Sequence, residues 1–243
     1  MKNIAAIVLA AGKGTRMKSA LPKVLHPILG RPMIYYTACL LNKLKIDGFF
    51  VVGAGKEKVK QALGEFNIRF ITQKEQLGTG HAVKIALPKI TGYNNVLILH
   101  GDSSAFFQPQ TIASLISSHK KQKATMSILT IQKESCDGSG MIFRNEKSQV
   151  VKNLETKGKT YYNCEVNVGV FCVDFFWLKQ NILSLPKHQD SSEYYFPDMI
   201  EIASCQKKKV IAVALNNAWE KTHINTPEQL KCANQLAKKY LKI

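Results

Sequence analysis

The chain has 243 residues, of which 45% are hydrophobic and 21% charged, a balance typical of soluble globular proteins. No apolar run is long enough to cross a bilayer, so we expect no membrane partner. The formal net charge is +17, but most of the cations are Lys and they are spread along the whole chain. We therefore expect no nucleic-acid partner, and instead a surface that attracts anionic substrates.

The cysteines indicate the compartment. Six cysteines are scattered along the sequence and form no Cys-x-x-Cys pair. This pattern predicts reduced thiols in a cytoplasmic protein, rather than a disulfide framework or a zinc site.

The first half of the chain alternates apolar and amphipathic segments. Strands are predicted over 4–9, 49–53, 68–72 and 95–100. Helices are predicted over 32–45, 56–64, 79–87 and 109–121. This alternation is typical of an α/β protein with a mixed, mainly parallel sheet and helices on both faces.

The second half has strands with few helices between them. These strands are predicted over 125–132, 140–144, 149–153 and 166–173, and they suggest an antiparallel addition over one edge of the sheet. The remaining predicted elements are helices over 174–184 and 193–205, a strand over 209–215, and a last helix over about 227–242. We expect a single domain, 1–243, with a first lobe over about 1–122 and a second over about 123–225.

A glycine-rich loop follows the first strand in the stretch LAAGKGTRM, residues 9–17. Gly12 and Gly14 allow the backbone to turn sharply and to approach a ligand closely. Exposed amides together with Lys13 and Arg16 suit a polyanion. The sequence therefore predicts a phosphate-binding loop.

Three other interpretations of this loop fail. A Walker A motif needs Gly where Ile7 stands and Ser or Thr where Gly14 stands. A dinucleotide fingerprint needs a third Gly where Met17 stands. A signal peptide is disfavoured because the apolar stretch is short and no clear small-x-small cleavage site follows it.

Two further segments carry groups that suit a nucleotide. Lys23 lies in the extended segment LPKVLHPILGRP, from which it can reach back to phosphates. In QKEQLGTGHA, residues 73–82, the amides of Gln73 and Gln76 can pair with a base edge. Gly78 and its neighbours allow close approach, and Thr79 is placed to cap the next helix.

Two residues carry oxygen atoms that are suited to coordinate a metal ion. One follows a predicted strand and the other precedes a predicted helix. Asp102 ends the apolar run VLILHGD, so its carboxylate is expected at the carboxyl edge of the sheet, where such sheets bind ligands. Asn225 in HINTPEQL stands just before the last helix. Both suit Mg²⁺, although Asp102 is also compatible with a simple turn and Asn225 with a helix cap.

The remaining polar candidates lie in the second half. Glu155 and Asn167 are suited to form hydrogen bonds with sugar hydroxyls. Gly140 precedes both in the same part of the sequence. No His or Cys nucleophile is evident. Three histidines lie in the motif regions, and we expect them to form local hydrogen bonds: His26, His81 and His100.

Together these segments resemble the sugar-phosphate nucleotidyltransferases, and among them the uridyltransferase (pyrophosphorylase) domain of bacterial N-acetylglucosamine-1-phosphate uridyltransferases. The segments that carry the resemblance are LAAGKGTRM, LPKVLH, QLGTGHA, the Gly-Asp pair at 101–102, EVNVG and SSEYYFPDMI. The resemblance covers nearly the whole chain. It implies a Rossmann-like nucleotide-diphospho-sugar transferase fold with a small antiparallel sugar-binding lobe.

The resemblance also implies roles and a reaction. The catalytic cations would be Arg16 and Lys23, the Mg²⁺ ligands Asp102 and Asn225, and the sugar-binding residues Gly140, Glu155 and Asn167. The uridine nucleotide would be bound by Leu9, Ala11, Gly12, Gly14, Gln73, Gln76, Gly78 and Thr79. The implied substrates are UTP and a sugar 1-phosphate, with N-acetylglucosamine 1-phosphate foremost, and the products are a UDP-sugar and pyrophosphate.

Two segments depart from the family pattern. After Gly101-Asp102 the family has Val-Pro-Leu where this chain has residues 103–105, Ser-Ser-Ala; around Gly140 the usual Tyr-Gly-Arg becomes Ser-Gly-Met. These departures leave open another sugar or alcohol phosphate, a CTP-dependent enzyme, or a non-catalytic nucleotide-binding protein. The 243 residues show no hexapeptide repeat, so we expect no acetyltransferase β-helix from them, and the oligomeric state is left open.

Overall fold

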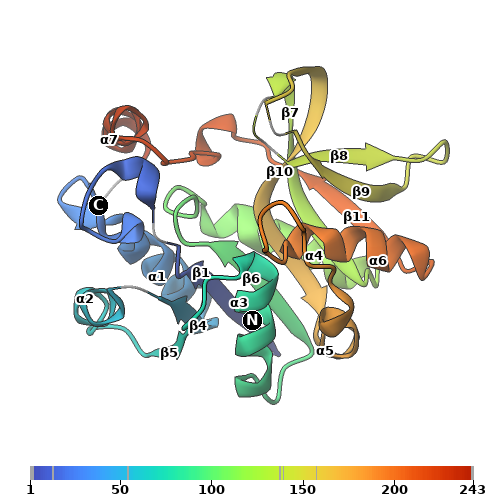
Figure 1. The fold of residues 1–243 in the computed structure, drawn as a ribbon, viewed down its shortest axis with the longest axis horizontal. Coiled ribbons are helices and arrows are strands. Elements are labelled where there is room, and N and C mark those ends of the chain that lie inside the picture. The colour runs from blue at the N-terminus through green and yellow to red at the C-terminus, as the bar shows by residue number, and fades with distance from the viewer. Residues whose placement is uncertain are drawn as a thin grey trace.

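The computed structural model describes residues 3–12, 14–53, 55–136, 138, 140–156 and 158–241. One nine-stranded sheet runs through the described chain in the order β11-β7-β10-β6-β1-β4-β5, with β8 and β9 branching from β10 (Figure 1). Its strands are β1 (Ile4–Ala10), β4 (Asp47–Val52), β5 (Ile68–Thr72), β6 (Asn95–His100), β7 (Met126–Cys136), β8 (Gly140–Arg144), β9 (Val150–Glu155), β10 (Tyr161–Asp174) and β11 (Val210–Ala214). A separate short hairpin is formed by β2 (Pro27–Ile28) and β3 (Arg31–Pro32).

The central strands are parallel, as predicted. β1 pairs in parallel with β4 on one side and with β6 on the other, and β4 pairs in parallel with β5. β11 is parallel to β7, whereas β10 is antiparallel to both β6 and β7. The carboxyl ends of β1, β4, β5 and β6 therefore meet at one edge of the sheet, which is where ligands bind in this class of fold.

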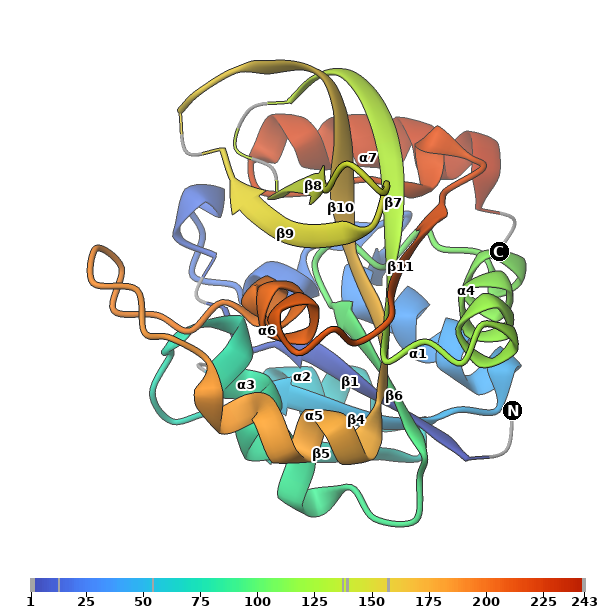
Figure 2. The same cartoon turned by 90° about the vertical axis from the view of Figure 1, so that its right-hand side faces the viewer.

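Helices cover both faces of the sheet. They are α1 (Met33–Leu44), α2 (Lys56–Ala62), α3 (Gly78–Ala86), α4 (Pro109–Lys121), α5 (Phe175–Asn181), α6 (Met199–Cys205) and α7 (Pro227–Tyr240). Figure 2 shows α5 and α6 on one side of the sheet and α4 on the other. Within the described residues, no helix combines the length and the apolar character needed to cross a bilayer.

The two cores follow from the alternation of side chains along the buried strands. On β1, Ala6 and Val8 contribute to the core that α1, α4 and α7 cover, whereas Ala5 and Ile7 contribute to the core under α3, α5 and α6. Successive strand residues point to opposite faces, so a strand buried on both sides appears as a continuous apolar run. This is the pattern from which β1 was predicted.

Capping residues set the starts of several helices. The carboxylate of Asp174 accepts a hydrogen bond from the backbone of Trp177 (2.7 Å) at the start of α5. The hydroxyl of Thr226 accepts one from the backbone of Gln229 (3.3 Å) at the start of α7. Proline occupies the first position of α4 and α7, where its missing N–H costs nothing.

The predicted antiparallel addition lies beside β6, at one side of the parallel strands. β10 lies between β6 and β7, and its first half pairs with β7 and, through Val166 and Met141, with β8. The pairing register of β10 shifts between Asn167 and Phe171, where Gly169 has a left-handed φ of +83°. One bent, 14-residue strand therefore joins the main sheet to the small lobe.

Two predicted helices are shorter than expected. The helix predicted over 174–184 ends at Asn181 and continues as a 3₁₀ turn over Ile182–Ser184. The helix predicted over 193–205 begins as a 3₁₀ turn over Phe196–Asp198, and α6 follows it. Pro197 cannot donate a backbone hydrogen bond, which restricts it to the first turn.

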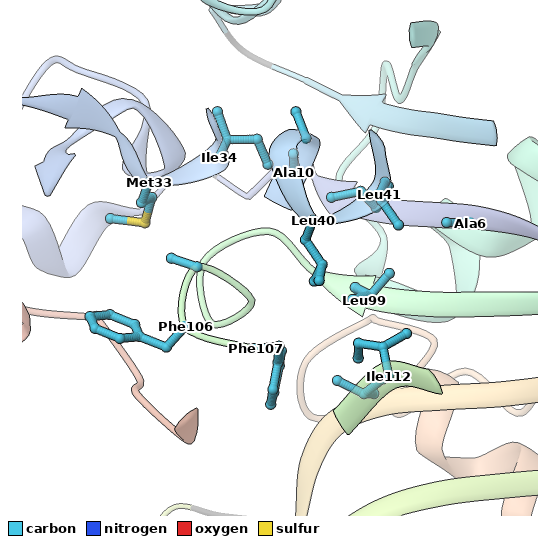
Figure 3. Close-up of a cluster of buried hydrophobic side chains, with 14 of the residues drawn as sticks. Ala6, Ala10, Met33, Ile34, Leu40, Leu41, Leu99, Phe106, Phe107 and Ile112 are labelled. Carbon is cyan, nitrogen blue, oxygen red and sulfur yellow. The ribbon is translucent and has the colours of Figure 1, made fainter. Parts of the chain in front are cut away.

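The segment after β6 is anchored in the core. Figure 3 shows Phe106 and Phe107 projecting from this segment into a cluster that includes Met33, Leu40 and Ile112. All five side chains are at least 96% buried. This anchoring fixes the loop that carries Asp102.

Candidate active site

A cavity of about 590 Å³ lies at the carboxyl edge of the central strands. The structure brings twelve of the predicted site residues to its lining: Leu9, Ala11, Gly12, Gly14, Arg16, Lys23, Gln73, Gln76, Gly78, Thr79, Asp102 and Asn225. Sequence reasoning did not assign the other four lining residues, which are Ala82, His100, Glu193 and Tyr195. Glu193 and Tyr195 both lie in SSEYYFPDMI, one of the segments that carry the family resemblance.

The glycine loop contacts Lys23 directly. Gly14 has a left-handed φ of +65°, and a Cβ at this position would lie 2.5 Å from the Cβ of Lys23. Both the conformation and the close approach require glycine here. Gly12 has no such constraint, because nothing lies within 4 Å of where its Cβ would be. Lys13 lies outside the described residues.

Lys23 is buried, and its ammonium group joins two distant parts of the chain. Its Nζ donates to Oδ2 of Asp102 and to Oδ1 of Asn225, each at 2.5 Å. Nη2 of Arg16 donates to the same Asn225 oxygen at 3.3 Å. Burial raises the pKa of the Asp102 carboxyl, but the charge of Lys23 and its hydrogen bond oppose burial, and this pKa lies below its ordinary value.

The Asp102 and Asn225 oxygens suit a hard divalent cation. Both oxygens already converge on one cationic group, and both are of the type that Mg²⁺ prefers. Among the described residues, no group of three or more His, Cys, Asp or Glu side chains could hold a metal. Mg²⁺ in proteins commonly has only one or two protein ligands, and water and substrate phosphates fill its other coordination positions.

The histidines of the motif regions differ in their partners. Nδ1 of His81 lies 3.0 Å from the side-chain amide of Gln73, as expected for a local hydrogen bond. The His26 ring forms a hydrogen bond with the backbone of Leu21, as expected. The Nε2 atoms of His26 and His100 are buried and have no hydrogen-bond partner among the described residues. Burial lowers the pKa of both rings, which keeps them neutral at pH 7.

The segment after β5 is braced by hydrogen bonds within the protein. Nε2 of Gln76 donates to the carbonyl of Ala11 (2.8 Å), which ties this segment to the glycine loop. Nε2 of Gln73 donates to the carbonyl of Gly78 (3.2 Å). Gly78 has a left-handed φ of +90°, and a Cβ there would lie 2.5 Å from the carbonyl oxygen of Tyr194.

Thr79 does not cap a helix, contrary to the prediction. It lies inside α3, and its hydroxyl accepts a hydrogen bond from the backbone of Phe196 (2.9 Å). The backbone of Gly80 also donates to the carbonyl of Tyr194 (2.8 Å). Thr79 therefore joins α3 to the segment that brings Tyr195 to the cavity.

The three predicted sugar-binding residues gather outside this cavity, around one residue that the sequence did not single out. Gly140 pairs with Glu155 across the β8–β9 ladder. Asn153 donates from Nδ2 to Oε1 of Glu155 (3.1 Å) and accepts at Oδ1 from Nδ2 of Asn167 (3.3 Å). Asn153 and Glu155 line a second cavity of about 470 Å³, and Tyr195 lines both cavities.

The departures from the family pattern are accommodated in the core. Ser103 and Ser104 are buried, and Oγ of Ser104 lies 2.7 Å from Oγ1 of Thr37 on α1. Met141 is buried beside Cys136, with 3.9 Å between the two sulfur atoms. Ser139 lies outside the described residues. The altered side chains that the structure describes therefore contact their own fold rather than the 590 Å³ cavity.

Two curated proteins are similar in sequence to nearly the whole of this chain. The bifunctional protein GlmU of Pelobacter propionicus is 37% identical over 248 residues, which cover 98% of this chain and 53% of that protein. GlmU of Bacillus subtilis is 35% identical over 237 residues, which cover 96% of this chain and 52% of that protein. The chain thus spans about half the length of the curated relatives it matches.

Solved structures and a family model complete the comparison. HddC from Yersinia pseudotuberculosis has the same fold, with a TM-score of 0.71 at 19% identity over 95% of this chain and 98% of that one. The same protein complexed with GMP-PN gives a TM-score of 0.69 at 18% identity. Residues 6–162, well over half of the chain, match the family model of the MobA-like NTP transferase domain. The chain therefore belongs to the MobA-like NTP transferase domain family and is a nucleotidyltransferase.

Proposed function

We propose that the chain transfers a uridylyl group from UTP to a sugar 1-phosphate, foremost N-acetylglucosamine 1-phosphate, and releases pyrophosphate. A phosphate oxygen of the sugar phosphate attacks the α-phosphorus of UTP. The bond from this phosphorus to the bridging oxygen breaks, and pyrophosphate leaves with the electron pair. The nucleophile is already an anion, so no general base is needed, in accord with the neutral His100 beside the cavity.

The nucleotide end of the site rests on the glycine loop and on the segment after β5. Gly12 and Gly14 let backbone amides approach the phosphates, and Gln76 holds this loop through its bond to Ala11. Gln73 and Gln76 both line the cavity, and in this proposal their amides would contact the base. Their existing bonds orient these amides before a nucleotide arrives.

The phosphate end depends on charge. Arg16 and Lys23 line the same cavity as the glycine loop and would neutralise the triphosphate as charge moves to the leaving group. Asp102 and Asn225 would hold Mg²⁺, which when bound supplies further charge neutralisation and a fixed geometry for the phosphates. Catalysis would therefore consist mainly of positioning and electrostatic stabilisation.

One observation carries this proposal. Three residues from distant parts of the sequence bring their polar atoms together in the cavity that the glycine loop lines: Lys23, Asp102 and Asn225. An anion-binding loop, a buried cation and two oxygen ligands in one cavity suit a metal–triphosphate complex. The family membership supports nucleotidyl transfer, whereas UTP and the sugar are our inference from the resemblance.

The test is pyrophosphate release by the purified chain with Mg²⁺. UTP, CTP, ATP, GTP and dTTP are each combined with a panel of sugar 1-phosphates that includes N-acetylglucosamine 1-phosphate. We expect release with UTP and a sugar 1-phosphate. Release only with another nucleotide would replace UTP, and no release with any pair would contradict the proposed reaction.

A matched pair of variants assigns the activity to this cavity. Asp102→Asn removes a carboxylate charge at the predicted metal position and should lower turnover by at least about a hundredfold. Asp47→Asn makes the same change at the opposite end of the sheet, where Asp47 accepts from Tyr93 (2.6 Å), and should leave turnover unchanged. Equal effects of both variants would mean that the losses come from misfolding.

A second candidate keeps the fold and changes the acceptor. The altered segments at 103–105 and around Gly140 favour it, because in the family they lie at the metal and sugar ends of the site. The 470 Å³ cavity beside Glu155 also leaves room for an acceptor of another size. The acceptor panel separates these two candidates.

A further inference from the structure

The predicted sugar-binding residues are joined by a chain of hydrogen bonds that runs in one direction. The backbone N–H of Gly169 donates to Oδ1 of Asn167 (2.7 Å), and Nδ2 of Asn167 donates to Oδ1 of Asn153 (3.3 Å). Nδ2 of Asn153 then donates to Oε1 of Glu155 (3.1 Å). Each amide in this relay accepts with its oxygen and donates with its nitrogen.

The direction of the relay fixes the orientation of both amides. A backbone N–H can only donate, so the Asn167 atom that faces Gly169 is its oxygen, and its nitrogen faces Asn153. Asn153 consequently presents its oxygen to Asn167 and its nitrogen to Glu155. A carboxylate can only accept, so Glu155 terminates the relay.

The two amides of the relay are buried and closely packed, whereas Glu155 at its end is exposed. Asn153 is 6% exposed and Asn167 is 9% exposed. A Cβ at position 140 would lie 2.6 Å from Oδ1 of Asn153 and 3.1 Å from Oε1 of Glu155, so only Gly leaves room for this arrangement. Buried polar groups that are fully paired hold a single geometry, because every alternative leaves one of them unpaired.

The relay also connects the two cavities. At its start, Gly169 packs against the ring of His100, which lines the 590 Å³ cavity two residues before Asp102. At its end, Asn153 and Glu155 line the 470 Å³ cavity, and Tyr195 lies in the wall of both. A molecule that reacts in the first cavity and extends toward Tyr195 would meet the carboxylate of Glu155.

We propose that Asn153 is a positioning residue for the acceptor: it holds Glu155 and Asn167 in the geometry that binds the hydroxyl groups of a sugar phosphate. This inference rests on the proposed function, because it takes the acceptor to be a sugar phosphate. A carboxylate has several acceptor sites, so one held in a fixed orientation can accept hydrogen bonds from hydroxyl groups. The substrate class is therefore an acceptor with free hydroxyls, which a deoxygenated analogue would lack.

The principal variant is Asn153→Leu, which keeps the size of the side chain and removes both hydrogen bonds. We expect the KM for the sugar phosphate to rise about tenfold, while the KM for UTP and kcat change by less than about twofold. Calorimetric titration of the protein with N-acetylglucosamine 1-phosphate should show the same weakening without turnover. Asn153→Asp should not rescue binding, because it places a second carboxylate against Glu155.

The matched control is Asn145→Ala on the same β8–β9 hairpin. Asn145 accepts from the backbones of Lys147 (3.1 Å) and Gln149 (2.9 Å) and donates to the Gln149 side chain (2.8 Å), but it takes no part in the relay. This variant loosens the hairpin and should leave the KM for the sugar phosphate unchanged. An equal rise in both variants would show that Asn153 only stabilises the hairpin and would overturn the proposal.

The outcomes separate this proposal from the proposed function. If the wild-type chain releases pyrophosphate and Asn153→Leu binds the sugar phosphate as tightly as the wild type, the positioning role is wrong and the reaction stands. If calorimetry detects no sugar phosphate bound to the wild type, the positioning role is wrong. If no nucleotide and acceptor pair reacts, the proposed reaction fails, and binding alone decides the role of Asn153.

Discussion

Lys23 and Asp102 form a partly buried ion pair in which the ammonium group occupies the side of the carboxylate that faces Asn225. The two oxygens that are predicted to hold Mg²⁺ are therefore already bound to a cation. Lys23 and a metal ion therefore compete for the same two oxygen atoms, and both cannot bind them fully at the same time. Binding of the metal should release Lys23 toward the phosphates of the nucleotide.

The variant Lys23→Met tests this competition. In the absence of nucleotide, we expect Mn²⁺ or Mg²⁺ to bind about tenfold more tightly than to the wild type, because the internal cation is removed. Turnover should nevertheless fall, because the phosphates lose a cation. Metal binding is measured by titration with Mn²⁺ and electron paramagnetic resonance.

Lys18→Met serves as the control, because Lys18 is exposed and close in sequence. It should leave metal affinity unchanged. Weaker metal binding to Lys23→Met than to the wild type would mean that Lys23 organises the metal site rather than competing for it.

Gly14→Ala should disrupt the contact between the glycine loop and Lys23. The new methyl group would lie 2.5 Å from the Cβ of Lys23, in a left-handed backbone conformation. We expect a loss of about 1–3 kcal/mol in the free energy of unfolding, together with a fall in turnover. Gly92→Ala separates the two causes, because Gly92 is also left-handed (φ +84°) but has nothing within 4 Å of the new methyl group. Equal effects of the two variants on stability would exclude the contact with Lys23 as a cause.

The residues that line the 590 Å³ cavity could be predicted because several of them follow strand ends. Gly14 comes soon after β1 and Asp102 soon after β6, and these strands are parallel neighbours, so their carboxyl ends meet. Local patterns of apolar residues were enough to place both strands. Asn225 was found through the resemblance and through its position before a capped helix.

The relay could not be predicted in the same way. Asn153 stood at the end of a predicted strand, and Glu155 is only two residues further along the same strand, β9. Asn167, on β10, reaches Asn153 only through the pairing of β8 with both β9 and β10. Long-range register leaves little trace in local sequence. The expectation that Thr79 caps α3 failed for a similar reason, because its hydroxyl bonds to Phe196, more than a hundred residues away in the sequence.

Glu220 should be among the most important single residues for stability. Its side chain is fully buried, and its oxygens accept from the backbone of Gln108, the hydroxyl of Thr111 and the amide of Asn217, each at 2.9 Å. This carboxylate joins the start of α4 to the loop that leads to Asn225.

Glu220→Ala would take the buried acceptor away from three hydrogen bonds and leave a gap in its place, so we expect a loss of about 3–5 kcal/mol in the free energy of unfolding. Glu220→Gln keeps one acceptor oxygen and should lose less. Urea denaturation measures both, with Glu57→Ala as the control, because the ion pairs that Glu57 forms with Lys56 and Lys60 are exposed. A loss below about 1 kcal/mol in Glu220→Ala would contradict the assigned role.

His119 should make the protein less stable in mild acid. Its ring is buried in α4, with Nδ1 2.7 Å from Oγ of Ser127 and Nε2 3.0 Å from Oδ1 of Asn95. Burial lowers the pKa of His119 from 6.5 to about 4. Between these two pH values the unfolded chain binds a proton that the folded protein does not, so stability falls as the pH decreases from 6.5 toward 4. The full loss is of the order of 3 kcal/mol.

His119→Asn removes this proton linkage. His223 has a similarly lowered pKa of about 4 through burial, so the variant should keep part of the acid sensitivity. The measurement is the free energy of unfolding in urea at pH 7 and at pH 4.5 for both proteins. We expect the variant to be less stable at pH 7, because it loses contacts with Ser127 or Asn95, but to lose clearly less stability between the two pH values. An unchanged difference between pH 7 and pH 4.5 would mean that His119 can take up a proton in the folded protein, despite its burial.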